Sequence, residues 1–202
     1  MSAYPVVSNP YGFKPVNRVD GLPYAGAIRQ IPLGSYATAL YNGDVVKIAT
    51  GGTISLAAAG ASEITSATIL GVFVGCQYTN SSGQTVQAQY YPGTTVTNAI
   101  AYVIDDPMAA YKVAVANATG VVTTVTQAAV GTNMSYYNGT GSSTTGDSGA
   151  WVLAGSGANT ATLPFRVIAV VPDTNVTSTT FCEVIVKVNT DQYLTALANN
   201  LS

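Results

Sequence analysis

Four consecutive residues, Gly146-Asp147-Ser148-Gly149, have the types that hydrolytic chemistry uses. In such a loop a serine can attack a carbonyl group while backbone N–H groups stabilise the oxyanion. The reaction needs a base for the serine proton, and the 202-residue chain contains no histidine. A lysine base would have to be desolvated, but three of the four lysines alternate with apolar neighbours in strand-like segments and should face solvent. We therefore expect no catalytic residue in this loop.

Asp105-Asp106-Pro107 is the only place where two carboxylates are adjacent. Neighbouring residues of a strand point to opposite faces, so these two carboxylates cannot act together as acid and base if the strand continues. Asp before Pro is ordinary turn chemistry, which is the interpretation we favour. A calcium site built from loop carboxylates and carbonyls is the alternative, and a glycosidase pair assembled from distant positions has no support in the sequence.

The absence of histidine removes the usual zinc, copper and non-haem iron sites as well as imidazole bases. Charged residues make up 8% of the chain, and the net charge of −2 with no cationic cluster argues against nucleic-acid binding. No run of about 20 mostly apolar residues predicts a membrane span. The N-terminus lacks the basic and apolar regions of a signal peptide. We therefore predict a protein that is not an enzyme and needs no cofactor or metal.

The composition predicts an all-β fold. Val, Ile and Thr total 61 residues against 10 Leu, and β-branched residues suit a pleated sheet. Short period-2 segments separated by turn signals such as Asn42-Gly43 and Pro92-Gly93 favour a β-sandwich or β-barrel of short antiparallel strands. The expected strands are 44–49, 69–79, 84–91, 99–105, 111–117, 120–126, 149–154, 163–171 and 181–188. Residues 191–200 predict a short C-terminal helix.

Residues 1–35 differ from the rest of the chain, because they contain five of the nine prolines and three of the seven cations. Each proline lacks a donor N–H and pushes its predecessor toward extended geometry. Such a segment can lie along its own chain or reach a neighbour. We expect an extended, Pro-rich N-terminal arm over 1–35 that docks on a surface, followed by a single β domain over 36–202.

Cysteine and tyrosine usage adds two expectations. Cys76 and Cys182 share strand parity with valines, so both should be buried free thiols, with a disulfide as the minority alternative. Thirteen of the aromatic residues are tyrosines. Tyrosine suits both the rim of a β-domain core and an interface with protein or sugar.

The N-terminal segment also resembles a group of tailed-bacteriophage virion proteins. The similar segments are Asn9-Pro10-Tyr11-Gly12-Phe13-Lys14-Pro15-Val16, residues 21–32 (GLPYAGAIRQIP), 43–47 (GDVVK), 71–76 (GVFVGC), 101–107 (AYVIDDP) and 184–187 (VIVK). The resemblance implies a capsid cement or head-decoration protein, a class that is generally all-β and commonly trimeric and lies on the outside of the head. It supplies no catalytic residues.

On this resemblance, the expected partners are the major capsid protein and further copies of the chain, most simply in a trimer. The expected location is the outer capsid surface of a virion assembled in the host cytoplasm. The capsid-facing residues expected from the arm are aromatic anchors and arginine clamps: Tyr4, Tyr11, Phe13, Arg18, Tyr24 and Arg29. A carbohydrate-binding or adhesin module using surface tyrosines and Trp151 is the alternative, and a hydrolase built on scattered carboxylates is a weaker one.

Overall fold

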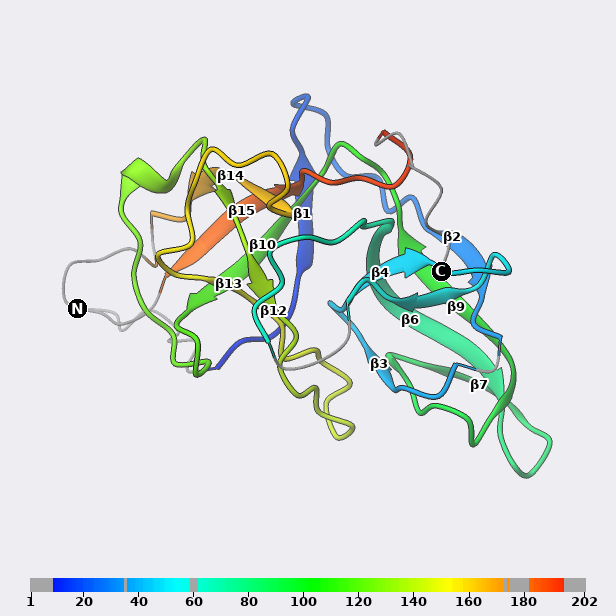
Figure 1. Cartoon of the computed structure of the whole chain (residues 1–202). Helices are drawn as coiled ribbons and strands as arrows, with labels where there is room; N and C mark the ends of the chain where they lie inside the picture. The colour runs from blue at the N-terminus through cyan, green and yellow to red at the C-terminus, as the bar shows by residue number, and fades with distance from the viewer. Residues whose placement is uncertain (1–8, 35, 59–61, 173, 175–181, 195–202) are drawn as a thin grey trace.

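The computed structural model of the chain describes residues 9–34, 36–58, 62–172, 174 and 182–194. Within these residues the fold is nearly all-β, as predicted, and the one helical element is the 3₁₀ turn η1 (Gln127–Ala129). The strands form two large sheets, which lie side by side in Figure 1, and a small two-stranded one.

The first sheet is nearly closed and barrel-like, in the order β11-β14-β15-β10-β13-β12, with β1 paired to β10. Its two end strands are separated by one residue, Ser135, so a single extended segment pairs with β14 on one side and β13 on the other. The pairing of β10 with β13 is parallel, whereas the prediction was antiparallel throughout. The strands are β1 (Lys14–Arg18), β10 (Ala109–Ala116), β11 (Asn133–Met134), β12 (Tyr136–Tyr137), β13 (Trp151–Leu153), β14 (Phe165–Val170) and β15 (Glu183–Val188).

The second sheet has the order β2-β9-β6-β4-β5, with β7 paired to β6. The long strand β6 is central in this sheet, as the apolar run at its start suggested. The strands are β2 (Arg29–Pro32), β4 (Val45–Ile48), β5 (Ile54–Leu56), β6 (Gly71–Thr79), β7 (Thr85–Ala88) and β9 (Thr97–Ile104), and the small sheet pairs β3 (Leu40–Tyr41) with β8 (Tyr90–Tyr91).

The fold has two hydrophobic clusters. The first contains inward residues of β10, β14 and β15 with four buried aromatic rings, and it extends to Val45, Val72 and Ile104 of the second sheet. The second is built from β4, β6 and β9 around Phe73. Cys182 belongs to the first cluster and Cys76 to the second, and both are buried and free, as expected. Burial raises the pKa of Cys76 to about 12, so this thiol stays protonated at neutral pH.

The structure does not show a separate arm in residues 9–33. Instead β1 adds a strand to the first sheet and β2 adds one to the second. The prolines permit this because Pro15 lies beside an irregularity in the β1–β10 register and Pro32 is the last residue of the edge strand β2. The segment thus lies along its own chain, the first of the two arrangements that its composition allowed.

Two further expectations concern residues 120–126 and 191–200. Residues 120–126 were expected to form a strand, but Val122 makes only an isolated bridge with Ala116. Residues 191–194 form a bridge and a turn, with Asp191 opposite Ile69, and the rest of the expected C-terminal helix lies outside the described residues.

Candidate functional site

Phe13, one of the six expected capsid contacts, is a core residue. Its side chain is 0% exposed. The ring stacks on Phe165 with centroids 4.4 Å apart and meets the Tyr136 ring edge-on at 6.1 Å. The expectation of Phe13 as an exposed anchor is therefore corrected, because the barrel-like sheet closes around it. Tyr4 lies outside the described residues.

Tyr11 fastens the same segment to the outside of the first sheet. Its hydroxyl donates a hydrogen bond to the Glu183 carboxylate, and the Lys112 ammonium lies 5.9 Å from the centre of its ring. Burial, reinforced by the hydrogen bond to Glu183, raises the pKa of Tyr11 well above its ordinary value. Tyr11 is thus engaged by its own chain rather than free for a partner.

The β1–β2 loop, residues 19–28, protrudes from the molecule between the two strands (Figure 1). Leu22 is 57% exposed and Ile28 is 52% exposed. The Tyr24 hydroxyl donates to the Ala27 carbonyl oxygen at 2.9 Å, which braces the loop internally. The loop therefore carries apolar side chains into solvent on a backbone with its own support.

Ion pairs hold the base of this loop on both sides. Arg18 contacts Asp20 at 2.8 Å and Asp106 at 2.7 Å, and Arg29 contacts Asp105 at 2.8 Å. The adjacent carboxylates Asp105 and Asp106 thus serve different arginines, in agreement with the turn interpretation. Arg18 and Arg29 position the loop, and their charges are already matched within the fold.

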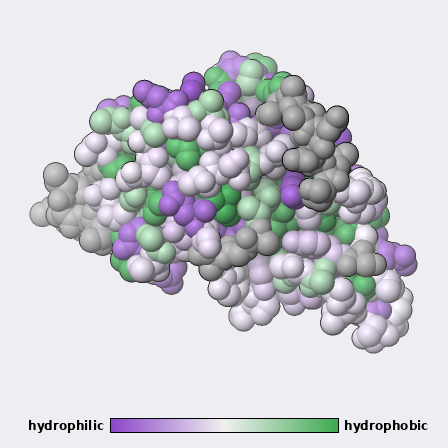
Figure 2. Space-filling model, viewed as in Figure 1, coloured by the Kyte–Doolittle hydropathy of each residue, from purple (hydrophilic) through white to green (hydrophobic). Residues whose placement is uncertain are grey.

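Two further exposed apolar side chains flank the loop. Val16 on β1 is 42% exposed and Met108 is 41% exposed, and the Val19 amide donates to the Met108 carbonyl oxygen at 2.9 Å. We call Val16, Leu22, Ile28 and Met108 the β1–β2 loop surface. Figure 2, in the same orientation as Figure 1, shows green and purple residues together at the top of the molecule, where the loop protrudes.

Ser148 of the Gly-Asp-Ser-Gly sequence is a structural residue. It is 2% exposed, and its hydroxyl accepts a hydrogen bond from the Ala150 amide at 3.0 Å and bonds to the Asp44 carboxylate. Its own amide donates to the Asn42 carbonyl oxygen at 3.0 Å. The Ser148 hydroxyl is thus bonded within its own chain, although the residue also lines a groove beside the loop at 138–149.

Lys14 lies beside this loop, but it cannot act as the missing base. Its ammonium group donates to Asp147 Oδ1 at 2.7 Å, to the Asn42 carbonyl oxygen at 3.1 Å and to Asn42 Oδ1 at 3.0 Å. Three acceptors match the three N–H donors of a protonated lysine. The cluster therefore ties β1 to the loop before Ser148 and leaves no free amine.

Asp44 is the buried carboxyl group at the centre of this cluster. It is 5% exposed, and the Tyr41 amide donates to its Oδ2 at 2.8 Å. Burial raises the pKa of Asp44 to about 6, although the hydrogen bonds from Ser148 and Tyr41 and the charge of Lys14 act in the opposite direction. The raised pKa of Asp44 thus follows from its burial in the fold.

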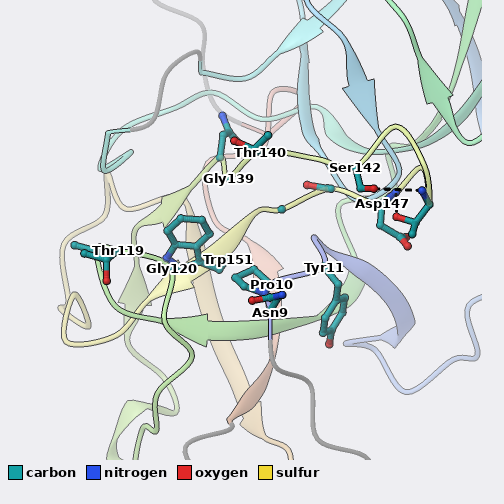
Figure 3. Close-up of a pocket in the computed structure, with 15 residues that line it drawn as sticks. Asn9, Pro10, Tyr11, Thr119, Gly120, Gly139, Thr140, Ser142, Asp147 and Trp151 are labelled. Atoms are coloured by element: carbon teal, nitrogen blue, oxygen red, sulfur yellow. Dashed lines mark hydrogen bonds between the residues drawn. The ribbon is translucent and has the colours of Figure 1, made fainter.

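A polar groove of about 880 Å³ opens between the N-terminal segment and the loop at 138–149, as Figure 3 shows. Trp151 lines it but is only 8% exposed. Its indole N–H donates to the Asn117 carbonyl oxygen at 3.1 Å, and its ring stacks on Tyr137 with centroids 5.1 Å apart. The carbohydrate-binding alternative thus lacks the exposed Trp151 platform that it assumed.

Among the residues that the structure describes, no three His, Cys, Asp or Glu side chains gather into a metal-binding group. In the same part of the chain, no helix has the length and hydropathy needed to cross a membrane. Comparison of the chain with protein-family models, with curated proteins and with solved structures finds no match.

The sequence predicted contact roles for Arg18, Tyr24 and Arg29 but gave no role to Leu22 and Ile28, which are exposed on the same loop. Leu22 and Ile28 contribute to no periodic segment, so no strand pattern pointed to them. The sequence did contain a signal for Leu22. In residues 21–26 (GLPYAG), Leu22 lies beside Pro23 and between two glycines, a pattern that predicts a loop with an exposed apolar residue.

Proposed function

We propose that this protein is a structural virion protein that binds the outer surface of a phage head and stabilises contacts between major capsid subunits. The observation that supports the proposal best is the β1–β2 loop surface, where two apolar side chains are exposed on a protruding loop with an ion-paired base and two more are exposed beside it. Its sequence, within residues 21–32, is also one of the segments that resemble virion proteins.

The physical logic is that of a passive clamp. A ligand that binds the assembled lattice and not free subunits shifts the equilibrium toward the lattice by mass action. Burying an exposed leucine or isoleucine side chain contributes about 1.5–3 kcal/mol. The nearby arginines are already paired with aspartates. Docking this surface therefore avoids the free-energy cost of desolvating unpaired charges.

The remaining parts of the proposal come from the sequence. We keep Tyr4 as a capsid contact and a trimeric state that multiplies weak contacts by avidity. Of the expected C-terminal helix over 191–200, we keep the part that follows the turn at 191–194. Light scattering of the purified protein tests the oligomeric state directly. A mass three times that of the monomer is the expected result, and a monomeric mass would remove the trimer from the proposal.

Co-sedimentation with phage heads that lack the protein tests the proposed function. Deleting residues 1–25 is a poor test, because it would also remove Phe13 and β1 from the fold. We expect the double variant Leu22→Asp, Ile28→Asp to stay folded and to bind heads at least about tenfold more weakly, the loss that 1.4 kcal/mol gives.

Val121→Asp is the matched control, since Val121 is 61% exposed in a different loop. This variant should occupy heads as the wild type does. If the wild-type protein does not pellet with heads, the proposed function is wrong. If the double variant binds as tightly as the control, the capsid is bound through another surface.

A further inference from the structure

The acidic side chains of the described residues all have partners inside the fold. Five of them form the ion pairs of the structure, and Glu63 accepts a hydrogen bond from Ser135. The remaining two, Asp44 and Asp191, are buried and accept backbone hydrogen bonds. In this part of the chain three cations have no ion pair: Lys47, Arg166 and Lys187.

Two of these three cations are direct neighbours. Arg166 on β14 lies opposite Lys187 on β15 in the antiparallel register. Both point away from the core, because Phe165, Val167, Val186 and Val188 fill the first hydrophobic cluster. Side chains directly opposite have Cβ atoms about 4.5–5.5 Å apart, and like charges in such a pair destabilise a sheet. A chain with so few cations thus places two where they repel.

Arg166 is also held in position. Its Nε donates to Asn133 Oδ1 at 3.0 Å, and Asn133 is 1% exposed. The Asn133 amide in turn donates to the Thr160 carbonyl oxygen at 3.0 Å, which fixes its orientation. The two terminal nitrogens of the guanidinium have no hydrogen-bond partner among the described residues. A buried amide therefore orients a guanidinium whose bidentate edge is unused.

The surroundings favour a protein ligand. Ile168, 36% exposed, and the half-buried Ile185 share the outer face with the two cations. Asp191 is the carboxylate that interacts electrostatically with Lys187. It is 2% exposed and accepts hydrogen bonds from the Tyr193 and Leu194 amides. An arginine fork and one lysine beside apolar residues match a single carboxylate, whereas a nucleic-acid backbone needs an extended row of cations.

We infer that Arg166 and Lys187 form a carboxylate-binding site on the β14–β15 face, occupied by an acidic side chain of a partner protein. The guanidinium supplies two parallel N–H donors and the ammonium a third charge contact. A carboxylate that binds between the two cations relieves their mutual repulsion. A site with only one of the cations would lack this contribution to binding. The site uses no residue of the β1–β2 loop surface, so it is independent of the proposed function.

Titration of the full-length protein with a hexaglutamate peptide at about 20 mM salt, where screening is weak, tests the site. NMR signals of the Arg166 Nε–H and of neighbouring amides in β14 and β15 report binding. We expect saturable shifts in these strands, and affinity reduced about two- to fivefold in Arg166→Gln and in Lys187→Gln, as for partly exposed ion pairs.

Lys47→Gln is the matched control, because Lys47 is also unpaired among the described residues but lies in the second sheet. It should bind hexaglutamate as the wild type does. No shift up to millimolar peptide, or an equal loss in Lys47→Gln, would overturn the site. Inorganic phosphate is titrated in parallel, and tighter binding of phosphate than of the peptide would overturn the choice of a carboxylate ligand.

Discussion

The two halves of the N-terminal segment occupy different places in the molecule. Residues 9–18 are built into the fold through the buried Phe13 ring, the Tyr11–Glu183 hydrogen bond and the Lys14–Asp147 ion pair. Residues 19–28 leave the surface and expose Leu22 and Ile28. Both halves contain proline and tyrosine, so these residue types alone do not distinguish them.

The difference lies in which groups have partners. In the first half the Phe13 ring is enclosed, and the Tyr11 hydroxyl and the Lys14 ammonium bond to the body of the chain. In the second half Tyr24 packs against the first cluster and bonds to Ala27, whereas the side chains of Leu22 and Ile28 are exposed. Stability should therefore depend on the first half and partner binding on the second.

Phe13→Ala is the strongest test of this contrast. Removing a fully buried aromatic side chain from between Phe165 and Tyr136 leaves a cavity in the first cluster. We expect the free energy of unfolding to fall by about 3–5 kcal/mol, measured by urea denaturation. Val16→Ala, at a position 42% exposed in the same segment, should change it by no more than about 0.5 kcal/mol. Equal losses in the two variants would refute the division of the segment.

The strands were largely predictable from the sequence, because strand periodicity is local. The run at 69–79 predicted β6, and the alternation at 181–188 predicted β15. The fate of Phe13 was not predictable, because its burial depends on the closing of a sheet by β11 and β12, far along the chain. The register that places Arg166 opposite Lys187 is likewise a long-range property.

Asp44→Asn tests the polar contacts that hold the first half against the body. Because burial raises the folded pKa of Asp44 to about 6, above its ordinary value of 3.8, the folded protein binds this proton more readily than the unfolded chain. The contribution of Asp44 to the free energy of unfolding therefore increases as pH falls from about 7 to about 4, by about 2–3 kcal/mol.

The measurement is the difference in free energy of unfolding between wild type and Asp44→Asn at each pH, which cancels the other carboxyl groups. We expect the free energy of unfolding of the variant to increase relative to that of the wild type as pH rises through 6, because the amide of Asn carries no buried charge. A difference that stays constant between pH 4 and pH 7 would mean that Asp44 titrates as an ordinary surface carboxyl group.

Arg29→Gln should have the smallest effect on stability. It therefore tests whether the second half of the segment acts in partner binding. The Arg29 side chain is 54% exposed in its pair with Asp105, and a solvent-exposed pair of this kind contributes about 0–1 kcal/mol. We expect a small loss in thermal stability that shrinks further in high salt, because screening weakens exposed pairs. Head binding should fall by more than this loss explains, since the loop then loses one of its two braces while Leu22 and Ile28 remain. A variant that binds heads normally would show that the apolar tip works without the ion-paired base.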